Sequence, residues 1–284
     1  MQVSSAQPKG TRWRAGDEIG TVEGRSTLVE VDTAALNKLD SRGYTVLEAI
    51  TDANLGQPQT FSRPNAFICI DGKTYWIKAK AQQGLVAELI GGRLAARVHA
   101  GPMARIIRVT SDVLPRPGMT ELVGVVAGVE DLPGTMNARD LEPFVKDGKF
   151  QPDVISLESR GRVTVFQTWI GARDSQVLVE LTTGTVYSID HGDCFEVTNT
   201  TVDPQVVVTA IPGVAPDAGK EAKYILPALA EMESVTDEEL LNVVCTVPTG
   251  EAWKSPVDRR VEIAKWLSRR RGRLREAMNQ WVKK

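Results

Sequence analysis

Alternating apolar and polar residues predict β-strands in the first half of the chain. The runs 65–70 (NAFICI) and 73–80 (KTYWIKAK) are joined by Asp71-Gly72, a dipeptide typical of tight hairpin turns. Further apolar runs at 102–111 and 121–129 predict two more strands. We therefore expect an antiparallel sheet in this part of the chain.

Apolar residues spaced three and four apart predict helices, one in the first half of the chain and several in the second. The most regular is 83–98 (QGLVAELIGGRLAARV), in which leucine, isoleucine and valine line one face. Further helices are predicted at 137–145, 163–170, 220–232 and 236–245, and from Ser255, as the N-cap before Pro256, to the C-terminus.

The change from strands to helices divides the chain into two predicted lobes. Residues 1–24 are polar and lack periodicity, which indicates a flexible arm. Two prolines and a glycine at 115–118 make the connection between the predicted strands 102–111 and 121–129 rigid, and we expect the chain to cross there from the sheet-rich lobe into the helical lobe. We therefore expect an α+β chain with a sheet-rich N-lobe at 25–115 and a mostly helical C-lobe at 116–284.

Two aspartates flank a second predicted hairpin, in the C-lobe. Its strands are 177–181 (VLVEL) and 186–189 (VYSI), joined by Thr-Thr-Gly-Thr. Asp174 precedes the first strand and Asp190 follows the second, so both carboxylates lie at the same end of the hairpin. Hard divalent cations bind oxygen ligands, and this pair would suit a site for a metal and a phosphate. The alternative is that both are surface turn residues, the commoner role of aspartate beside glycine.

A lysine and a glutamate form a second candidate pair, in the N-lobe. Lys78 lies in the predicted strand 73–80, and Glu88 is the one acidic residue of the predicted helix 83–98. Protein kinases use a strand lysine to hold nucleotide phosphates and a helix glutamate to hold that lysine. Glycines around Glu88 allow another backbone or a long side chain to come close. The alternative for Lys78 is an edge residue with its ammonium group in water.

Composition limits the classes of function. The 284 residues are 42% hydrophobic and 25% charged, as in soluble globular proteins, and the net charge of −2 gives no general attraction to nucleic acid. Three widely spaced cysteines without a CxxC pair fit a reducing compartment and no structural zinc. No apolar run is long enough to span a bilayer, so we expect a cytoplasmic protein with no membrane partner.

Seven arginines crowd the last predicted helix, at positions 259, 260, 269, 270, 271, 273 and 275. A solvated helix face is the commoner explanation of such a charge run. RNA binding is the alternative, and nucleic acid is not the expected partner.

Several segments, taken in order, form a pattern that one protein family also has. The strand lysine lies in YWIKAK, the helix glutamate in LVAELIGGRLA, and a glycine-centred strand reads LVGVVAGVE. WIGARDSQVLVEL and YSIDHGDCF follow, and the last helix contains LSRRRGRL. Over roughly residues 45–280 this pattern resembles the HipA-like kinases, in their compact branch without the long N-terminal extension of the HipA toxins. The upstream W-x-x-x-x-D together with IDHG is its most specific part.

The resemblance implies a bilobal fold of the protein-kinase and phosphoinositide-kinase type and a role for each matching residue. Lys78 would bind the phosphates of ATP, Glu88 would hold Lys78, and Asp174 would accept the proton of the substrate hydroxyl. Asp190 would bind Mg²⁺, with Gln176 as the one nearby amide for a second metal site. The implied activity is transfer of the γ-phosphate of ATP to a Ser or Thr hydroxyl of a protein. An antitoxin-like protein is one candidate partner.

The catalytic segment departs from the family pattern and is degenerate in three places. Ala172 stands where the family has an asparagine, and Ser175 replaces an arginine. The asparagine expected about five residues after Asp174 is missing, and in kinases that residue helps to hold a second metal ion. An active kinase, which we favour, and a pseudokinase that binds nucleotide or a protein partner therefore both stay open. An RNA-binding module is the third alternative.

Overall fold

The computed structural model describes most of the chain after residue 64. The described residues are 48–49, 65–70, 73–78, 82–109, 124–174, 176–199, 202, 211–214, 218–245, 247, 253 and 255–282. The predicted arm at 1–24 lies outside them. So does the side chain of Lys78, although its backbone is described.

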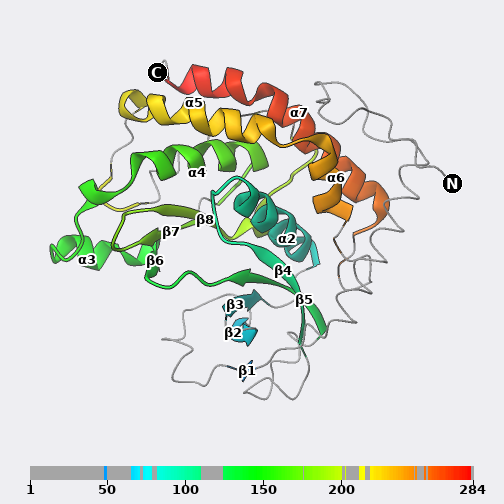
Figure 1. Cartoon of the computed structure of the whole chain (residues 1–284), viewed down its shortest axis with the longest axis horizontal. Coiled ribbons are helices and arrows are strands. Elements are labelled where there is room, and N and C mark those ends of the chain that lie inside the picture. The colour runs from blue at the N-terminus through cyan, green and yellow to red at the C-terminus, as the bar shows by residue number, and fades with distance from the viewer. Residues whose placement is uncertain are drawn as a thin grey trace.

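A five-stranded antiparallel sheet forms the N-lobe (Figure 1). Its strands, in spatial order, are β1 (Glu48–Ala49), β2 (Asn65–Ile70), β3 (Lys73–Lys78), β5 (Gly124–Glu130) and β4 (Ala104–Val109). The register pairs Ile70 with Lys73, which confirms the predicted β2–β3 hairpin. The strands predicted from the apolar runs further along the chain are also present, as β4 and β5.

Helix α2 (Gln82–Arg97) packs against β4 and β5. Its apolar face is fully buried at Leu89, Ile90 and Leu94, as its spacing predicts. Gly92 allows the helix to approach β4 closely, because a Cβ at this position would lie 2.5 Å from the Cβ of Ala104. The sheet and α2 thus form one packed layer pair.

The N-lobe sheet extends beyond the predicted lobe boundary at residue 115. Strand β5 lies in that sheet, between β3 and β4, and pairs with both. The predicted boundary thus falls between β4 and β5, two neighbouring strands of this sheet. The chain changes sheets later, between Glu130 and Thr135.

A three-stranded antiparallel sheet opens the C-lobe, with strand order β6, β7, β8. These strands are β6 (Thr135–Asn137), β7 (Gln176–Glu180) and β8 (Val186–Ile189). Val177, Val179 and Val186 point into the core, and alternate positions are partly exposed. The predicted hairpin is therefore confirmed, with β6 as a third strand that the sequence pattern did not reveal.

The helix predicted at 137–145 is instead three short elements. Asn137 ends β6, and its side-chain oxygen accepts a hydrogen bond from the backbone N–H of Arg139 at 3.0 Å. The 3₁₀ turn η3 (Ala138–Asp140) and the short helix α3 (Glu142–Lys146) follow. Asparagine competes for backbone hydrogen bonds in this way, which favours a cap or turn over a continuous helix.

Helix α4 (Leu157–Ile170) is the central buried helix of the C-lobe. It follows the 3₁₀ turn η4 (Pro152–Val154), and Ser156 caps it by accepting from the N–H of Ser159 at 3.3 Å. The prediction recognised its apolar second half but missed its polar first turns. The helix ends at Gly171, whose left-handed conformation (φ 62°) suits glycine.

Helices α5 (Ala218–Ser234) and α7 (Val257–Val282) pack against α4, and α6 (Asp237–Cys245) packs against α7 (Figure 1). Helices α5 and α7 also contact each other. A capping box opens α6: the Thr236 hydroxyl accepts from the N–H of Glu239, and the Glu239 carboxylate accepts from the N–H of Thr236. Helix α7 begins one residue later than predicted, so Ser255 precedes the cap.

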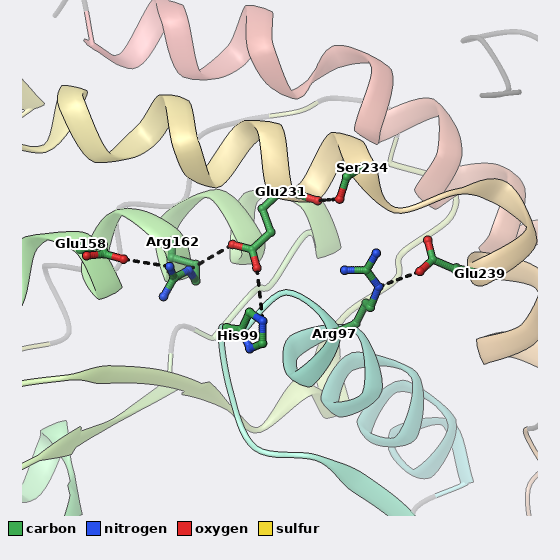
Figure 2. Close-up of polar contacts among 7 residues, drawn as sticks. All are labelled: Arg97, His99, Glu158, Arg162, Glu231, Ser234 and Glu239. Carbon is green, nitrogen blue, oxygen red and sulfur yellow. Dashed lines mark hydrogen bonds and ion pairs between the residues drawn. The ribbon is translucent and has the colours of Figure 1, made fainter. Parts of the chain in front are cut away.

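Surface contacts join α2 to the helices of the C-lobe, as Figure 2 shows. Arg97 Nε donates to Glu239 Oε1 at 2.7 Å, and His99 Nε2 lies 3.9 Å from Glu231 Oε1. Glu231 also accepts from Arg162 of α4. Each exposed ion pair stabilises little, so together they orient the lobes more than they hold them together. Among the described helices, none is long and apolar enough to cross a membrane.

Candidate active site

Asp190 lies where the chain leaves β8. Its backbone is left-handed, with φ 57°, a conformation that aspartate tolerates better than most residues. This turn leads into the 3₁₀ turn η5 (His191–Asp193), which packs against α2. A Cβ built on Gly192 would lie 3.7 Å both from Asp190 Oδ1 and from the Cα of Gly84. The Asp190 carboxylate therefore lies beside the contact between η5 and α2.

Asp174 lies at the same end of the β7–β8 hairpin, just before β7. Arg139 Nη2 donates to both of its carboxylate oxygens, at 2.7 Å to Oδ1 and 2.9 Å to Oδ2. Arg139 comes from η3, which follows the strand β6 that pairs with β7. Both side chains are about half exposed, so water screens their attraction.

Gln176 joins the two aspartates. Its Nε2 donates to Asp190 Oδ2 at 2.8 Å and to Asp174 Oδ2 at 3.0 Å. The structure therefore brings together the three residues that the sequence singled out around the hairpin. The amide presents its nitrogen to both carboxylates, where a metal ligand would present its oxygen. Among the described residues, no group of three or more His, Cys, Asp or Glu is arranged to hold a metal ion.

Glu88 is buried on the face of α2 that meets η5. Its Oε1 lies 3.9 Å from Nδ1 of His191, which is also buried. Gly91 makes room for the imidazole, because a Cβ there would lie 2.4 Å from the Cβ of His191. The glutamate predicted in the N-lobe is thus next to the segment that carries Asp190.

A chain of buried polar groups continues from His191 into the C-lobe. His191 Nε2 lies 3.0 Å from the Ser188 hydroxyl of β8, which accepts from Gln167 Nε2 of α4 at 3.0 Å. Gln167 Nε2 also lies 3.4 Å from the backbone carbonyl of Gln176. All three side chains are fully buried, and the rings of Phe166 and His191 pack in a T-shaped arrangement.

Lys78 ends β3, in register with Asn65 of β2. The predicted contact between the Lys78 ammonium and Glu88 falls on a side chain outside the described part of the structure. It stays a prediction.

The pKa of the Cys194 thiol is affected by the charged residues of the candidate site. Burial raises its pKa well above the usual value, and the carboxylates of Glu88, Asp190 and Asp193 raise it further. Arg270 acts in the opposite direction. Three carboxylates and one guanidinium therefore lie near the Cys194 thiol at the base of the site.

Three of the C-terminal arginines are buried, so the predicted solvated face is wrong for them. Arg260, Arg270 and Arg271 are each at most 3% exposed. Arg270 donates to the backbone carbonyls of Thr168 and Trp169 at the end of α4. Arg271 donates to Asp237 Oδ1 at 2.6 Å. These side chains form hydrogen bonds inside the protein, so their guanidinium groups are not accessible to an RNA.

Sequence reasoning missed Arg139, Gln167 and Ser188. Gln167 and Ser188 did leave a signal, because each interrupts an apolar run (VFQTWI and VYSI) at a position that proves buried. A polar residue in such a place needs a hydrogen-bonding partner. Arg139 left none, since it lies 35 residues from Asp174 in a segment of mixed composition.

Comparisons with protein-family models and with curated proteins find no match. Among solved structures, the chain is similar to the Helicobacter pylori proinflammatory kinase CtkA. The TM-score is 0.52 with 10% identity, and the match covers 84% of this chain and 97% of that chain. The FAT and kinase domain of CtTel1 matches 83% of this chain and 24% of its own, at 12% identity and a TM-score of 0.38, which is too low to carry an argument. The likeness to CtkA shows that this α+β chain has a bilobal, kinase-like fold.

Proposed function

We propose that the protein is an ATP- and Mg²⁺-dependent kinase of the HipA-like type, which transfers the γ-phosphate to a Ser or Thr hydroxyl of a protein. The arrangement of Asp174, Gln176 and Asp190 carries the proposal: two carboxylates joined by one amide at the open end of a hairpin. They lie in a chain with a kinase-like fold, beside the buried Glu88. A protein substrate and an antitoxin-like partner belong to the same proposal.

Each residue has a distinct task in this mechanism. Lys78 binds the phosphates of the nucleotide, and Glu88 holds the lysine in place. Asp174 orients the hydroxyl of the substrate and accepts its proton. Catalysis then comes from the alignment of the two reactants and from the neutralisation of charge.

The residues at the hairpin end fit a magnesium ion by their chemistry. Carboxylate and amide oxygens are the protein ligands that Mg²⁺ prefers. The carboxylates of Glu88, Asp190 and Asp193 all lie near enough to the Cys194 thiol to act on it. Asp190 and Gln176 would hold the ion, which would neutralise phosphate charge when bound. Gln176 would first have to turn its amide, because its nitrogen now faces both carboxylates.

A pseudokinase is the second candidate function, and Arg139 favours it. Arg139 donates to both oxygens of Asp174 and Gln176 donates to one, so the carboxylate that should receive a proton already accepts three hydrogen bonds. A site in this arrangement could bind nucleotide without transferring phosphate. The RNA-binding alternative loses support, because Arg260, Arg270 and Arg271 are buried.

Nucleotide binding is the first test. We expect ATP with Mg²⁺ to raise the melting temperature of the full chain, by the free energy of binding to the native state. Asp190→Ala should abolish this rise. Asp193→Ala, an exposed carboxylate three residues further on, is the matched control and should keep it. If neither variant differs from the wild type, Asp190 does not bind nucleotide through a metal ion.

Phosphate transfer is the second test and separates the two candidates. Incubation with γ-labelled ATP should label a protein substrate or the chain itself, and Asp174→Asn should lower the rate by at least about 100-fold. Binding of ATP without transfer to any protein would favour the pseudokinase.

A further inference from the structure

The buried contacts of Ser188 determine the direction of its hydrogen bonds. Within the described part of the chain, its hydroxyl contacts two polar side-chain atoms, Gln167 Nε2 and His191 Nε2. Gln167 presents the nitrogen of its amide because the same nitrogen faces the carbonyl of Gln176, which can only accept. The Ser188 hydroxyl therefore accepts from Gln167 and has its own hydrogen left to donate.

His191 Nε2 receives that hydrogen. A nitrogen that accepts a hydrogen bond carries no hydrogen in the neutral imidazole, so the hydrogen of the ring is on Nδ1. Nδ1 is the atom that lies 3.9 Å from Glu88 Oε1. If Nε2 donated instead, the Ser188 hydroxyl would accept from both neighbours, and its own hydrogen would be buried without an acceptor among its described contacts. Donation of that hydrogen to Gln167 would require the amide to turn its oxygen toward the Gln176 carbonyl, and two acceptors would then repel.

We infer that His191 is a positioning residue for Glu88, and that Gln167 and Ser188 fix its tautomer so that the Nδ1–H faces the Glu88 carboxylate. The polar chain crosses from α4 through β8 and η5 to α2. It thereby couples the position of the N-lobe glutamate to the segment that carries Asp190. The consequence for catalysis rests on the proposed function, whereas the tautomer does not.

Both histidines are well suited to a direct measurement. The chain contains two of them, and the side chain of His99 is 77% exposed, which makes it an internal reference for a histidine in water. Long-range ¹H–¹⁵N correlation spectra of protein labelled with ¹⁵N-histidine distinguish the two neutral tautomers. The spectra are recorded on the wild-type protein at a pH where both rings are neutral.

We expect the resonances of His191 to show the Nδ1–H form alone, while those of His99 show the exchange average of a solvated ring. An Nε2–H form at His191 would overturn the inference. This measurement needs no variant, so it decides the tautomer whether or not the variants below fold.

Ser188→Ala tests the fixing of the tautomer. Without the hydroxyl, we expect the resonances of His191 to move toward the exchange average. Ser159→Ala is the matched control: Ser159 is also buried and accepts from the N–H of Val186 at the start of β8, but it lies outside the polar chain. Resonances of His191 that stay unchanged in Ser188→Ala would contradict the role of Ser188.

The affinity of the protein for ATP tests whether His191 positions Glu88. Loss of a residue that orients a ligand-binding group typically weakens binding by about 10-fold or more, so we expect this loss for Ser188→Ala and none for Ser159→Ala. Equal ATP affinity of wild type and Ser188→Ala would overturn the positioning role. If the wild-type protein binds no ATP, the proposed function fails, and the tautomer still stands or falls on the spectra.

Discussion

Gln176 is the residue on which the candidate site depends most directly. Two carboxylates at one hairpin end repel each other, and the amide N–H groups of Gln176 partly offset that repulsion. The amide thus performs in the free protein part of the task that a bound cation would perform. A change of charge at this one position should reveal whether a cation belongs here.

Gln176→Glu should make the stability of the protein depend on magnesium. A third carboxylate removes both hydrogen bonds and adds repulsion, so we expect the melting temperature in EDTA to fall by about 3 °C. Addition of Mg²⁺ should then raise it by more than in the wild type. The measurement is a thermal melt with and without the ion.

Gln151→Glu serves as the control for this change. Gln151 is exposed and donates only to the carbonyl of Gly148, at 3.3 Å, among its described contacts. Its melting temperature should respond to Mg²⁺ as the wild type does. The same response in both variants would show that no cation binds between the aspartates.

At the residue scale, the sequence predicted those site residues whose positions follow from a local element. Asp174 and Asp190 flank one hairpin, and the turn between its strands brings both ends together. Arg139 could not be found in this way, because it reaches Asp174 from η3, a turn distant in the sequence. Contacts between distant segments depend on packing, which leaves no local pattern.

At the element scale, two glycines of helix α2 differ in how closely a neighbouring segment packs against them. A Cβ on Gly91 would lie 2.4 Å from the Cβ of His191, whereas a Cβ on Gly84 would have no atom closer than 3.8 Å. Gly91 is therefore required for the close packing of α2 against η5, whereas Gly84 is not.

Gly91→Ala should displace α2 from η5 and cost about 2 kcal/mol of stability, since the clash is with a fully buried ring. We also expect it to weaken the ATP-dependent rise in melting temperature. Gly84→Ala, in contrast, should be neutral or stabilise by up to about 1 kcal/mol through helix propensity. Urea denaturation measures both, and equal losses would contradict the packing argument.

The capping box of α6 gives a prediction of pH dependence. Burial alone raises the pKa of Glu239, but hydrogen bonds with Arg97 and Thr236 outweigh it, and the pKa lies below its ordinary value of 4.5. A lowered pKa in the folded state stabilises the protein above about pH 4.5, and this contribution is lost as the pH falls through the lower, folded value.

Glu239→Gln should therefore destabilise the protein by about 0.5 kcal/mol at pH 7, where the ion pair with Arg97 is present. The difference from the wild type should shrink as the pH falls below 4.5. Glutamine preserves the capping box, so the variant isolates the charge. Glu238→Gln, an exposed residue of the same helical turn, should show no such trend in urea midpoints at several pH values.

Element boundaries followed local signals wherever these were strong. Asp71-Gly72 predicted the β2–β3 hairpin, and Thr236 with Glu239 predicted the start of α6. The helix expected at 137–145 was wrong because Asn137 caps a turn after a strand that shows no alternation of its own. A three-residue strand is too short for a periodic pattern.

At the scale of the whole molecule, α7 holds the C-lobe together through buried arginines. Arg270 binds the last carbonyls of α4 and stacks on Trp266, with 4.5 Å between its guanidinium carbon and the ring centroid. Trp169 of α4 donates in return to the carbonyl of Leu267. These contacts fix the helix end from which Asp174 follows.

Arg270→Met should cost about 3 kcal/mol, because it removes the buried guanidinium that donates to the carbonyls of Thr168 and Trp169. Arg269→Met, a neighbour on the exposed side of α7, should change stability by less than about 0.5 kcal/mol. Urea denaturation compares them. Similar losses would mean that the arginine side chains act by charge alone.

The arginine run shows why the sequence could not supply this part of the architecture. Arg269, Arg270 and Arg271 are identical in type and adjacent, yet one is exposed and two are buried. Which of them points inward depends on where α4 and α5 end, and that is decided by packing across the whole lobe.

The place of β5 in the N-lobe sheet has a consequence for the order in which the chain folds. Tyr75 of β3 pairs with Glu130, so one edge of β3 has no partner until residues 124–130 have left the ribosome. The β2–β3 hairpin can form early, since its contacts are local, whereas the pairing of β3 with β5 must wait for a long loop to close. During synthesis this open strand edge is exposed to mispairing with other strands.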